Sequence, residues 1–588
     1  MPRAGAIRAR PAPMSAVPSR GHAARASALR DPTNWVLVLA ALSLVLLIVV
    51  PLLSIFREAF TDEDGRLTLA NFVSTFSDRQ ARQATLNTIV LSLAVAALST
   101  LIAIPLAFGE ARTAMPFKRT LNAVALVSII SPGFLVALAY ALLLGPNMGL
   151  VNKALRALLS LEQSTGPFDI YGPWGFVFLT LPMGIGLCFL QITPALRSID
   201  ASVEEASRLA GAGPLQTARR VTLKLIRPAI LSGFILTFTL TLAAYGTPQV
   251  LGVNVLAIAI RGALLVTYDL KQAAVLSVAA TVIAVAAVFV YHQSMRAQSR
   301  YVTLGGRGAR QGLVDCGRWR HALVALTALY ALFGFVLPYG ALVVASFLRA
   351  MSRGFSLDNL TGANYAVLLS DEVTRHAFLN STILSLTSAV GVVLLGLVVG
   401  YLLERTRVRG RVILDYIAVL PLGLAGTAFG VAVLVTYLNP PFQFLGLPGT
   451  LAILWIAYVA HFVSFGVRGV QAGLVQIAPD LGEAARMAGA RRWRVVKDIE
   501  APLLGGTLVS IGLLVIVLCF PELSMSIMLR SVDTQVAATA LLNRWDGEGG
   551  FPGAAAMAVV MFAVIGVLLA VAQSFVAGRQ RWKRRSGS

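Results

Sequence analysis

Long apolar stretches separated by short polar segments dominate the chain from Trp35 onward. Because a bilayer core about 30 Å thick needs about 20 apolar residues per helix, each such stretch predicts one membrane-spanning helix. Six spans are predicted in the first half of the chain: Trp35–Phe56, Leu86–Phe108, Leu121–Leu144, Trp174–Leu196, Ala229–Val250 and Ala273–Tyr291. Six more follow: Leu323–Phe347, Ser381–Leu403, Val412–Tyr437, Leu451–Val467, Leu503–Phe520 and Ala554–Val576. Prolines within these spans, such as Pro132 and Pro421, predict kinks. The pattern predicts an all-α integral membrane protein with about 12 transmembrane helices.

The twelve spans contain an internal repeat. The stretch EEASRLAGAG matches GEAARMAGAR at a constant offset of 278, which pairs Glu205 with Glu483, Ala206 with Ala484, and Gly211 with Gly489. An earlier echo pairs ATLNTIVLSL with AFLNSTILSL at an offset of 293, with Asn87 opposite Asn380. We therefore expect two homologous six-helix halves related by an axis along the membrane normal. The first half carries about fifteen extra residues, which we place in the outside loop 145–172.

Composition and charge agree with a membrane protein of fixed orientation. Hydrophobic residues make up 57% of the chain, charged residues 13%, and the net charge is +22. The basic residues gather in the N-terminal tail, in alternate loops and at the C-terminus, whereas loops of the other parity, such as 62–64, are acidic. By the positive-inside rule, both termini are cytoplasmic. The charge reports topology, so we do not expect nucleic-acid binding.

These patterns predict five segments. Residues 1–34 form a basic disordered tail, 35–295 the first six-helix half, 296–320 a cytoplasmic linker, 321–578 the second six-helix half, and 579–588 a basic C-terminal tail. The three cysteines, Cys188, Cys316 and Cys519, have neither metal-ligand spacing nor a disulfide framework. We therefore expect no metal site and no cofactor.

The two matched loops each predict a short helix, a glycine break and a second, basic amphipathic helix. Ser202 with Glu205, and Asp480 with Glu483, have the spacing of a capping box at a helix start. The glycine that follows each helix suits its end. One such loop alone would favour a helix lying on the anionic inner leaflet. Two copies with Glu, small residues and Gly at the same positions favour docking into a partner protein.

The loops resemble the EAA motif of ABC importer permeases. Glu483-Ala484-Ala485 and Gly489 follow it, with Ile499 and Pro502 behind, although Ala501 stands where Leu is usual. The first copy, Glu205-Ala206-Ser207 and Gly211, is looser, with Lys224 where Pro is expected. The resemblance implies that each loop is a coupling helix seated in a cleft of an ATP-binding subunit. A single chain with two such halves is similar to the fused permeases for ferric iron, 2-aminoethylphosphonate and thiamine.

The resemblance implies the permease of a type I ABC importer in a bacterial inner membrane, moving a small hydrophilic solute, with ferric iron favoured. Its partners would be a homodimeric ATP-binding subunit, an extracytoplasmic solute-binding protein and membrane lipid. No Gly-Lys pair exists for a P-loop, so ATP hydrolysis is expected in a separate chain and the permease is not an enzyme. The alternative is a secondary transporter of the major facilitator type, which would need buried carboxylates for ion coupling. A membrane-embedded enzyme lacks its motifs here.

Few ionisable residues fall at membrane depth. Glu110 and Glu404 close the second and eighth spans, and we expect each to pair with the arginine that follows it, Arg112 or Arg405. No catalytic residue is predicted. The predicted pathway residues are Tyr245, His461 and Glu522.

Overall fold

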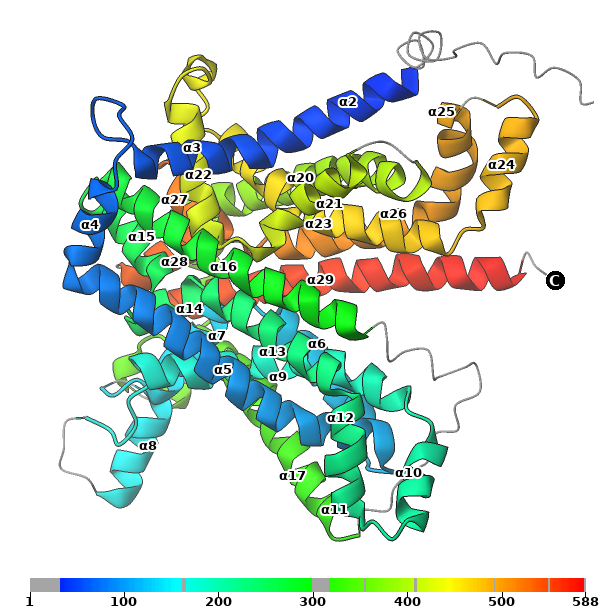
Figure 1. Ribbon diagram of the computed structural model, residues 1–588. Coiled ribbons are helices and arrows are strands. Elements are labelled where there is room, and N and C mark those ends of the chain that lie inside the picture. The colour runs from blue at the N-terminus through cyan, green and yellow to red at the C-terminus, as the bar shows by residue number, and fades with distance from the viewer. Residues whose placement is uncertain are drawn as a thin grey trace, which may run out of the picture.

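A computed structural model describes residues 32–585, except 148, 161–164, 299–316, 354–355, 407–409, 491 and 548–549. Most of the predicted N-terminal tail and linker, with Cys316, lies outside these residues. In the described residues the secondary structure is helical, and the β-type pairing there is limited to two isolated bridges, Thr61 with Leu67 and Leu348 with Leu360. Figure 1 shows the long helices running side by side.

The helices of the first half are α2 (Pro32–Leu44), η1 (Val45–Val49), α3 (Val50–Phe60), α4 (Ala70–Ser77), α5 (Arg79–Arg112), α6 (Lys118–Ile130), α7 (Gly133–Leu144), α8 (Leu150–Leu159), α9 (Pro173–Arg197), α10 (Ala201–Leu209), α11 (Pro214–Thr217), η2 (Ala218–Thr222), α12 (Leu223–Leu225), α13 (Arg227–Leu242), α14 (Gly246–Leu251), α15 (Leu256–Leu265) and α16 (Leu270–Gln298).

The second half comprises α17 (Trp319–Ala331), η4 (Leu332–Val336), α18 (Leu337–Ser346), η5 (Met351–Arg353), η6 (Leu357–Asn359), α19 (Ala363–Ser370), α20 (Glu372–Arg405), α21 (Arg411–Val419), η7 (Leu420–Gly423), α22 (Gly426–Leu438), η8 (Gln443–Leu445), α23 (Leu451–Val475), α24 (Pro479–Met487), α25 (Arg492–Val495), η9 (Val496–Glu500), α26 (Ala501–Cys519), α27 (Ser526–Leu529), α28 (Ala537–Asp546) and α29 (Gly550–Arg585).

The sequence repeat recurs in the helix bounds. α20 has the bounds of α5 shifted by 293, while α23, α24 and α25 have those of α9, α10 and α11 shifted by 278. The change of offset falls where the extra residues were expected, because the loop 145–172 contains α8 and its counterpart 439–450 is short. Each half repeats one local structure because it repeats one pattern of apolar and breaking residues.

Nine helices among the described residues are long and apolar enough to cross a membrane, or eleven when two bent pairs are counted as spans. One pair is α6 with α7, where the chain bends by 102°. The other joins the helical segment 218–225 to 227–242, with a bend of 62°. The predicted ninth span, Val412–Tyr437, divides at the predicted kink, Pro421, into α21, η7 and α22. Pro132 and Gly133 lie at the break between α6 and α7, and Pro421 lies in η7, between α21 and α22. Proline lacks the N–H that would continue the helix.

The first helix of each half packs on the other half. α2 contacts α20, and α3 contacts α22 as well as α16 of its own half. In return, α17 contacts α5 and α6, and α18 contacts α7. Tyr330 and Tyr140 add polar contacts across this boundary, since Tyr330 donates to the carbonyl of Pro182 at 3.0 Å and Tyr140 to that of Phe333 at 2.6 Å. The halves are therefore interlocked.

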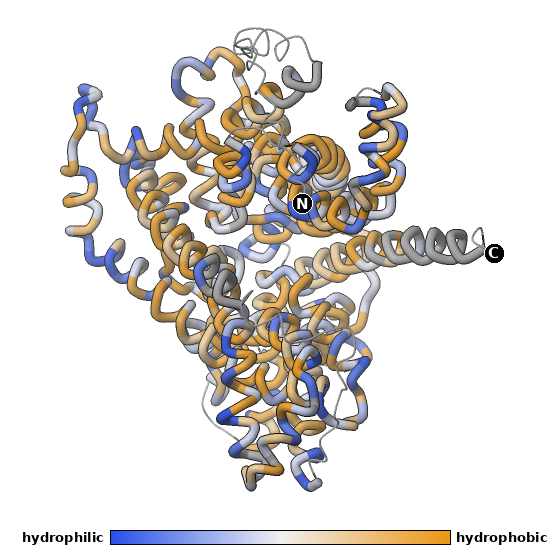
Figure 2. The backbone as a smooth tube through the Cα atoms, turned by 45° about the vertical axis from the view of Figure 1, so that its right-hand side comes forward, coloured by the Kyte–Doolittle hydropathy of each residue, from blue (hydrophilic) through white to orange (hydrophobic). Residues whose placement is uncertain are grey.

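One apolar core runs through both halves, with Phe134 and Leu276 from the first and Phe429 and Val463 from the second. Hydrophobic residues predominate along the long helices (Figure 2). Leu86 and Leu101 on α5 are exposed, as are the residues at the same places on α20, Leu379 and Leu394. These faces meet the lipid.

Candidate functional site

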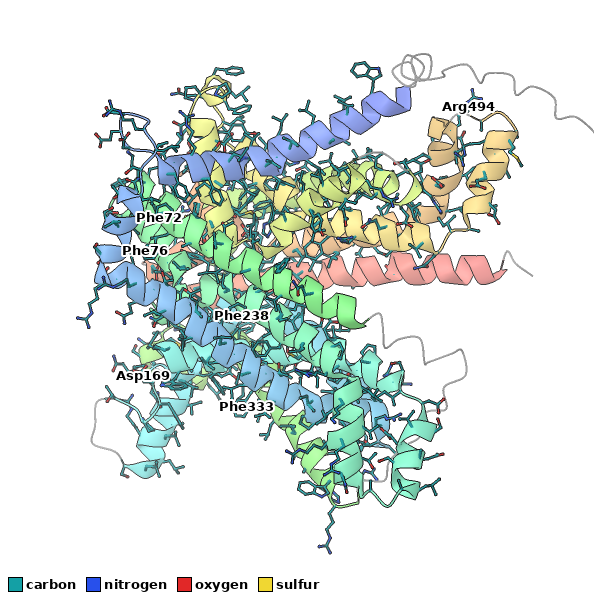
Figure 3. All side chains as sticks on the ribbon, in the orientation of Figure 1. Phe72, Phe76, Asp169, Phe238, Phe333 and Arg494 are labelled. Atoms are coloured by element: carbon teal, nitrogen blue, oxygen red, sulfur yellow. The ribbon has the colours of Figure 1, made fainter. Side chains whose placement is uncertain are left out.

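The two matched loops, α10 with α11 and α24 with α25, lie at the same end of the molecule, the right-hand side of Figure 1. Figure 3 shows Arg494 of α25 at this end and the exposed Asp169 toward the other. α2 begins and α29 ends on the side of the loops. The loops therefore present a paired surface at one face of the membrane domain.

Each loop has the predicted helix, glycine break and second helix. Gly211 and Gly489 adopt left-handed φ values of +85° and +87°, which an L-residue with a side chain rarely adopts. Beyond each glycine the next N–H returns to the first helix, from Ala212 to the carbonyl of Ser207 at 3.1 Å and from Ala490 to that of Ala485 at 3.0 Å. This six-to-one bond is that of a Schellman end. The prediction of the break is confirmed.

The predicted capping boxes are wrong. In the first loop the N–H of Ser202 donates to the carboxylate of Asp200 at 2.9 Å, so the cap lies two residues earlier. In the second loop α24 begins at Pro479, after Ala478, whose side chain accepts no capping bond. Proline needs no partner for the missing N–H in the first turn, so this start requires no capping side chain. Neither Glu205 nor Glu483 therefore serves at a helix start, and Glu483 instead lies 3.8 Å from the guanidinium of Arg486.

The three positions of each motif divide between an outer and an inner face. Glu205 and Ala206 are exposed, and so are Glu483 and Ala484. The third position turns toward the second helix of the loop. There the hydroxyl of Ser207 lies 3.0 Å from that of buried Thr217, and in the second loop the half-buried Ala485 and buried Val495 occupy the same two positions.

Four exposed apolar residues flank the exposed Glu and Ala, and the sequence reasoning missed them. Leu209 and Met487 end the first helix of each loop with 90% and 88% of their surface exposed. Val203 and Leu481, in the first turn of the same helices, are also exposed. Both pairs obey the offset of 278, which is the signal that could have identified them. Large apolar side chains repeated on two protruding loops mark a surface for a partner.

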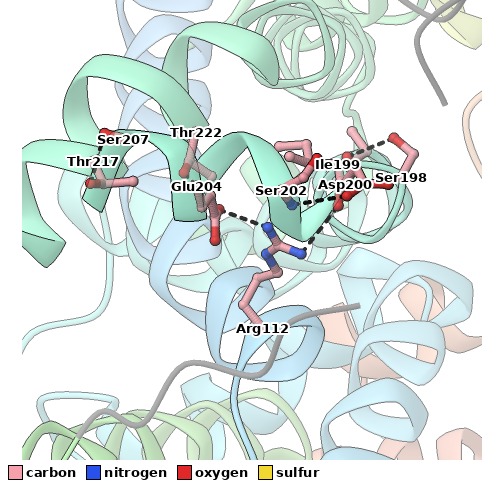
Figure 4. A network of polar contacts seen from close by, with 10 residues as sticks. Arg112, Ser198, Ile199, Asp200, Ser202, Glu204, Ser207, Thr217 and Thr222 are labelled. Carbon is pink, nitrogen blue, oxygen red and sulfur yellow. Dashed lines mark hydrogen bonds and ion pairs between the residues drawn. The ribbon is translucent and has the colours of Figure 1, made fainter. Parts of the chain in front are cut away.

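An arginine at the C-terminal end of α5 or α20 anchors each loop to that long helix. Arg112, at the end of α5, is fully buried and pairs with Glu204 at 2.7 Å (Figure 4). Arg405, at the end of α20, pairs with Glu500 at 3.3 Å. The expected pairs with Glu110 and Glu404 are wrong. A helix turns by about 100° per residue, so neighbours in sequence point apart.

The two glutamates themselves lie in different surroundings. Glu110 is buried and forms an ion pair with Arg197 at the end of α9, and the side-chain amide of Asn122 donates to it at 3.2 Å. Glu404 is exposed at the end of α20. At the offset of 293 Glu110 corresponds to Leu403, so the two glutamates do not occupy equivalent positions.

Of the predicted pathway residues, His461 lies on α23 against the rings of Phe429 and Phe462. Glu522 follows α26, and its carboxylate accepts from the N–H of Met525 at 2.9 Å and the N–H of Ser526 at 3.1 Å. These bonds satisfy amides at the start of the short helix α27.

Tyr245 lies at the boundary between the halves. It is buried between α13 and α14, and its hydroxyl donates to Gln249 at 3.3 Å. A side chain on the neighbouring Gly246 would meet Leu523, which occupies the position of Tyr245 in the second half. Arg530 lies outside the predicted spans, and burial together with the charge of Arg261 lowers its pKa.

Membrane-crossing helices in two interlocked halves, with paired loops exposed at one face, define the membrane subunit of a transporter. Comparison with known proteins agrees. The family described as "binding-protein-dependent transport system inner membrane component" matches residues 36–303. By this match the chain resembles the permeases of binding-protein-dependent ABC importers.

Relatives extend the likeness over the whole chain. It is 27% identical to the ferric transport system permease protein FbpB of Actinobacillus pleuropneumoniae, over 90% of this chain and 77% of that protein. It is 26% identical to a putative ferric transport system permease of Haemophilus influenzae, over 83% and 76%. A putative 2-aminoethylphosphonate permease of Salmonella paratyphi A is 28% identical over 38% of this chain and 75% of its own length.

Among solved structures, the bacterial alginate ABC transporter in complex with its periplasmic protein aligns with a TM-score of 0.34 and 18% identity. The alignment covers 43% of this chain and 91% of that one.

Proposed function

We propose that this permease imports ferric iron, delivered by an extracytoplasmic solute-binding protein, and that a homodimeric ATP-binding subunit drives it from the cytoplasmic face. This proposal rests on the two loops, whose helices have the same bounds at the offset of 278 and expose apolar side chains at equivalent positions. Two equivalent docking surfaces fit two copies of one partner.

The exposed faces of the loops carry the docking. Leu209 and Met487 are nearly fully exposed beside the exposed Glu205 and Glu483. Burying two such apolar side chains in a partner would stabilise the complex by about 1.5–3 kcal/mol each. The glycine break at Gly211 or Gly489 lets the second helix of each loop pack back against the first. ATP binding would then move the loops and shift the spans between outward-open and inward-open populations.

Iron is the proposed solute because two relatives that match most of the chain are named as ferric permeases. The phosphonate relatives match less than half of it. Tyr245, His461 and Glu522 remain the proposed pathway residues. Tyr245 is the best placed of the three, since it lies where the halves meet.

Copurification with the ATP-binding subunit tests the docking. We expect Leu209→Asp with Met487→Asp to reduce the ATPase recovered with the permease by at least about tenfold, because a carboxylate cannot enter an apolar cleft without losing its hydration. Glu205→Ala with Glu483→Ala should reduce stimulated ATP hydrolysis. Val532→Asp is the matched control, since Val532 is 82% exposed between α27 and α28, at the other end of the molecule.

Uptake of radiolabelled iron, in cells containing the binding protein, tests the solute. Excess 2-aminoethylphosphonate or thiamine should leave iron uptake unchanged. If iron does not enter and labelled phosphonate does, the solute is wrong. If uptake continues on an ion gradient without any ATPase, and the loop variants behave as wild type, the ABC mechanism itself is wrong.

A further inference from the structure

Each docking loop is tied to the membrane helices through an arginine, which is fully buried at Arg112 and partly buried at Arg405. Arg112 pairs with Glu204 on α10 and donates to the carbonyl of Ile199 at 3.3 Å (Figure 4). The carboxylate of Glu204 in turn accepts from the hydroxyl of Thr222 on η2 at 2.9 Å. A buried guanidinium without a counter-charge is very unfavourable. The end of α5 and both arms of the loop are therefore held together.

The second loop has the same arrangement at the equivalent arginine. Arg405 pairs with Glu500 and donates to the carbonyls of Leu474 at 2.9 Å and Ile477 at 2.7 Å. Arg405 corresponds to Arg112 at the offset of 293, and Ile477 to Ile199 at the offset of 278. We call Arg112 with Glu204 the first clamp and Arg405 with Glu500 the second clamp.

Each loop has a first arm, α10 or α24, and a second arm, α11 with η2 or α25 with η9. The carboxylate of the first clamp comes from the first arm, and that of the second clamp comes from the second arm. At the offset of 278, Glu204 corresponds to Gly482, and Thr222 corresponds to Glu500. A Cβ on Gly482 would lie 3.6 Å from Oε1 of Glu500, so the two carboxylates approach the same space. Each half thus has one carboxylate for one arginine, from the first arm in one half and the second arm in the other. The pair is kept although its position is exchanged.

We propose that Arg112 and Arg405 are positioning residues for energy coupling: the clamps transmit movement of the docked loops to α5 and α20. This inference rests on the proposed function. α5 packs along α9 and α13, and α20 along α23 and α26, so a movement passed to α5 or α20 reaches the bundle of each half. Without a clamp the loop can follow the ATPase while the spans stay still, and ATP is hydrolysed without transport.

Moving the carboxylate within one loop tests the inference. The full chain is reconstituted in proteoliposomes with its ATPase and binding protein, and solute moved per ATP hydrolysed is measured. We expect Glu204→Gly to lower this ratio by about tenfold and Glu204→Gly with Thr222→Glu to return it to within about twofold of wild type. The double variant builds in the first half the arrangement of the second.

The second half supplies the reciprocal comparison. Glu500→Thr should lower the ratio, and Glu500→Thr with Gly482→Glu should restore it. Gly482 accepts a side chain, because the nearest atoms to its Cβ would lie 3.4 and 3.6 Å away, at ordinary contact distance. This comparison decides the question if Glu204→Gly fails to reach the membrane.

Copurified ATPase is measured for every variant, which separates the two proposals. If the wild type binds no ATPase, the proposed function is wrong. The proposal about the clamps is tested only with variants that still bind the ATPase. A ratio that stays normal in an assembled Glu204→Gly or Glu500→Thr complex overturns the inference. So does a ratio that falls in the single variant and stays low in an assembled double variant.

Discussion

Small polar residues in the N-terminal parts of α5 and α20 explain why ATLNTIVLSL matches AFLNSTILSL. Thr88 accepts a bond from the N–H of Leu256, the first residue of α15, at 2.8 Å, and Ser381 accepts from that of Ala537, the first residue of α28, at 2.8 Å. The preceding Asn87 donates to the carbonyl of Asn254 at 2.9 Å. These residues hold α15 and α28 against the long helices.

Thr88→Val tests this role. The substitution keeps the shape but leaves a buried N–H without its acceptor, which should cost about 1–3 kcal/mol of stability. We expect a lower midpoint of thermal unfolding in detergent. Thr85→Val is the control, because its hydroxyl donates only within α5, to the carbonyl of Ala81. Equal midpoints for the two variants would contradict the role of Thr88.

Residue-level predictions succeeded where the cause is local. A glycine after a helix predicted the breaks at Gly211 and Gly489 because the left-handed conformation is a property of that residue alone. The pairing of Glu110 was wrong because its partner, Arg197, comes from another helix 87 residues later. Side chains that meet through packing cannot be paired from spacing along the sequence.

The helices α20 and α23 bring their backbones into close contact at two glycines, Gly396 and Gly466. A Cβ on Gly396 would lie 2.6 Å from the backbone carbon of Gly466, and a Cβ on Gly466 would lie 2.5 Å from the carbonyl of Val392. Backbone atoms of packed helices cannot move aside independently. Small residues permit this close contact in a membrane, where water does not drive helices together.

Gly396→Ala should therefore separate α20 from α23. We expect a loss of about 1–3 kcal/mol from overpacking, measured as a lower unfolding midpoint. Gly512→Ala on α26 is the control, since its Cβ would meet only Val393 at 3.6 Å. A midpoint of Gly396→Ala equal to that of the control would show that the helices can separate at no cost.

Span positions followed from hydrophobicity, but their continuity did not. The apolar run Val412–Tyr437 has the length of a span, yet it forms α21, η7 and α22. Hydrophobicity reports that a segment lies in an apolar environment. Whether the chain bends at Pro421 depends on neighbouring helices that accommodate the freed backbone groups, and these come from elsewhere in the sequence.

For the whole molecule, the exchange of first helices makes the two halves one unit. α3 lies against α22 and α18 against α7, so each half contributes a helix to the packing of the other. Separating them would expose the apolar surfaces of Phe134 and Phe429, which belong to one continuous core.

A protease site inserted between Gln298 and Gly317 tests this interlocking. After cleavage of the purified full chain we expect the two fragments to elute together in detergent, because the exchanged helices hold them without the covalent link. Cleaved protein in sodium dodecyl sulfate, which unfolds it, is the control. Elution of two separate fragments in mild detergent would contradict the exchange.

The sequence by itself determined the class of protein, most of the spans, the repeat and the two loops, because hydrophobic length, glycine chemistry and self-similarity act over a few residues. The tertiary structure alone decided which half each first helix covers, which carboxylate meets Arg112 or Arg405, and which loop residues face outward. Glu204 and Glu500 lie on different arms of their loops, yet each meets its arginine. A buried charge requires a partner in space, and any segment of the folded chain that reaches it can supply one.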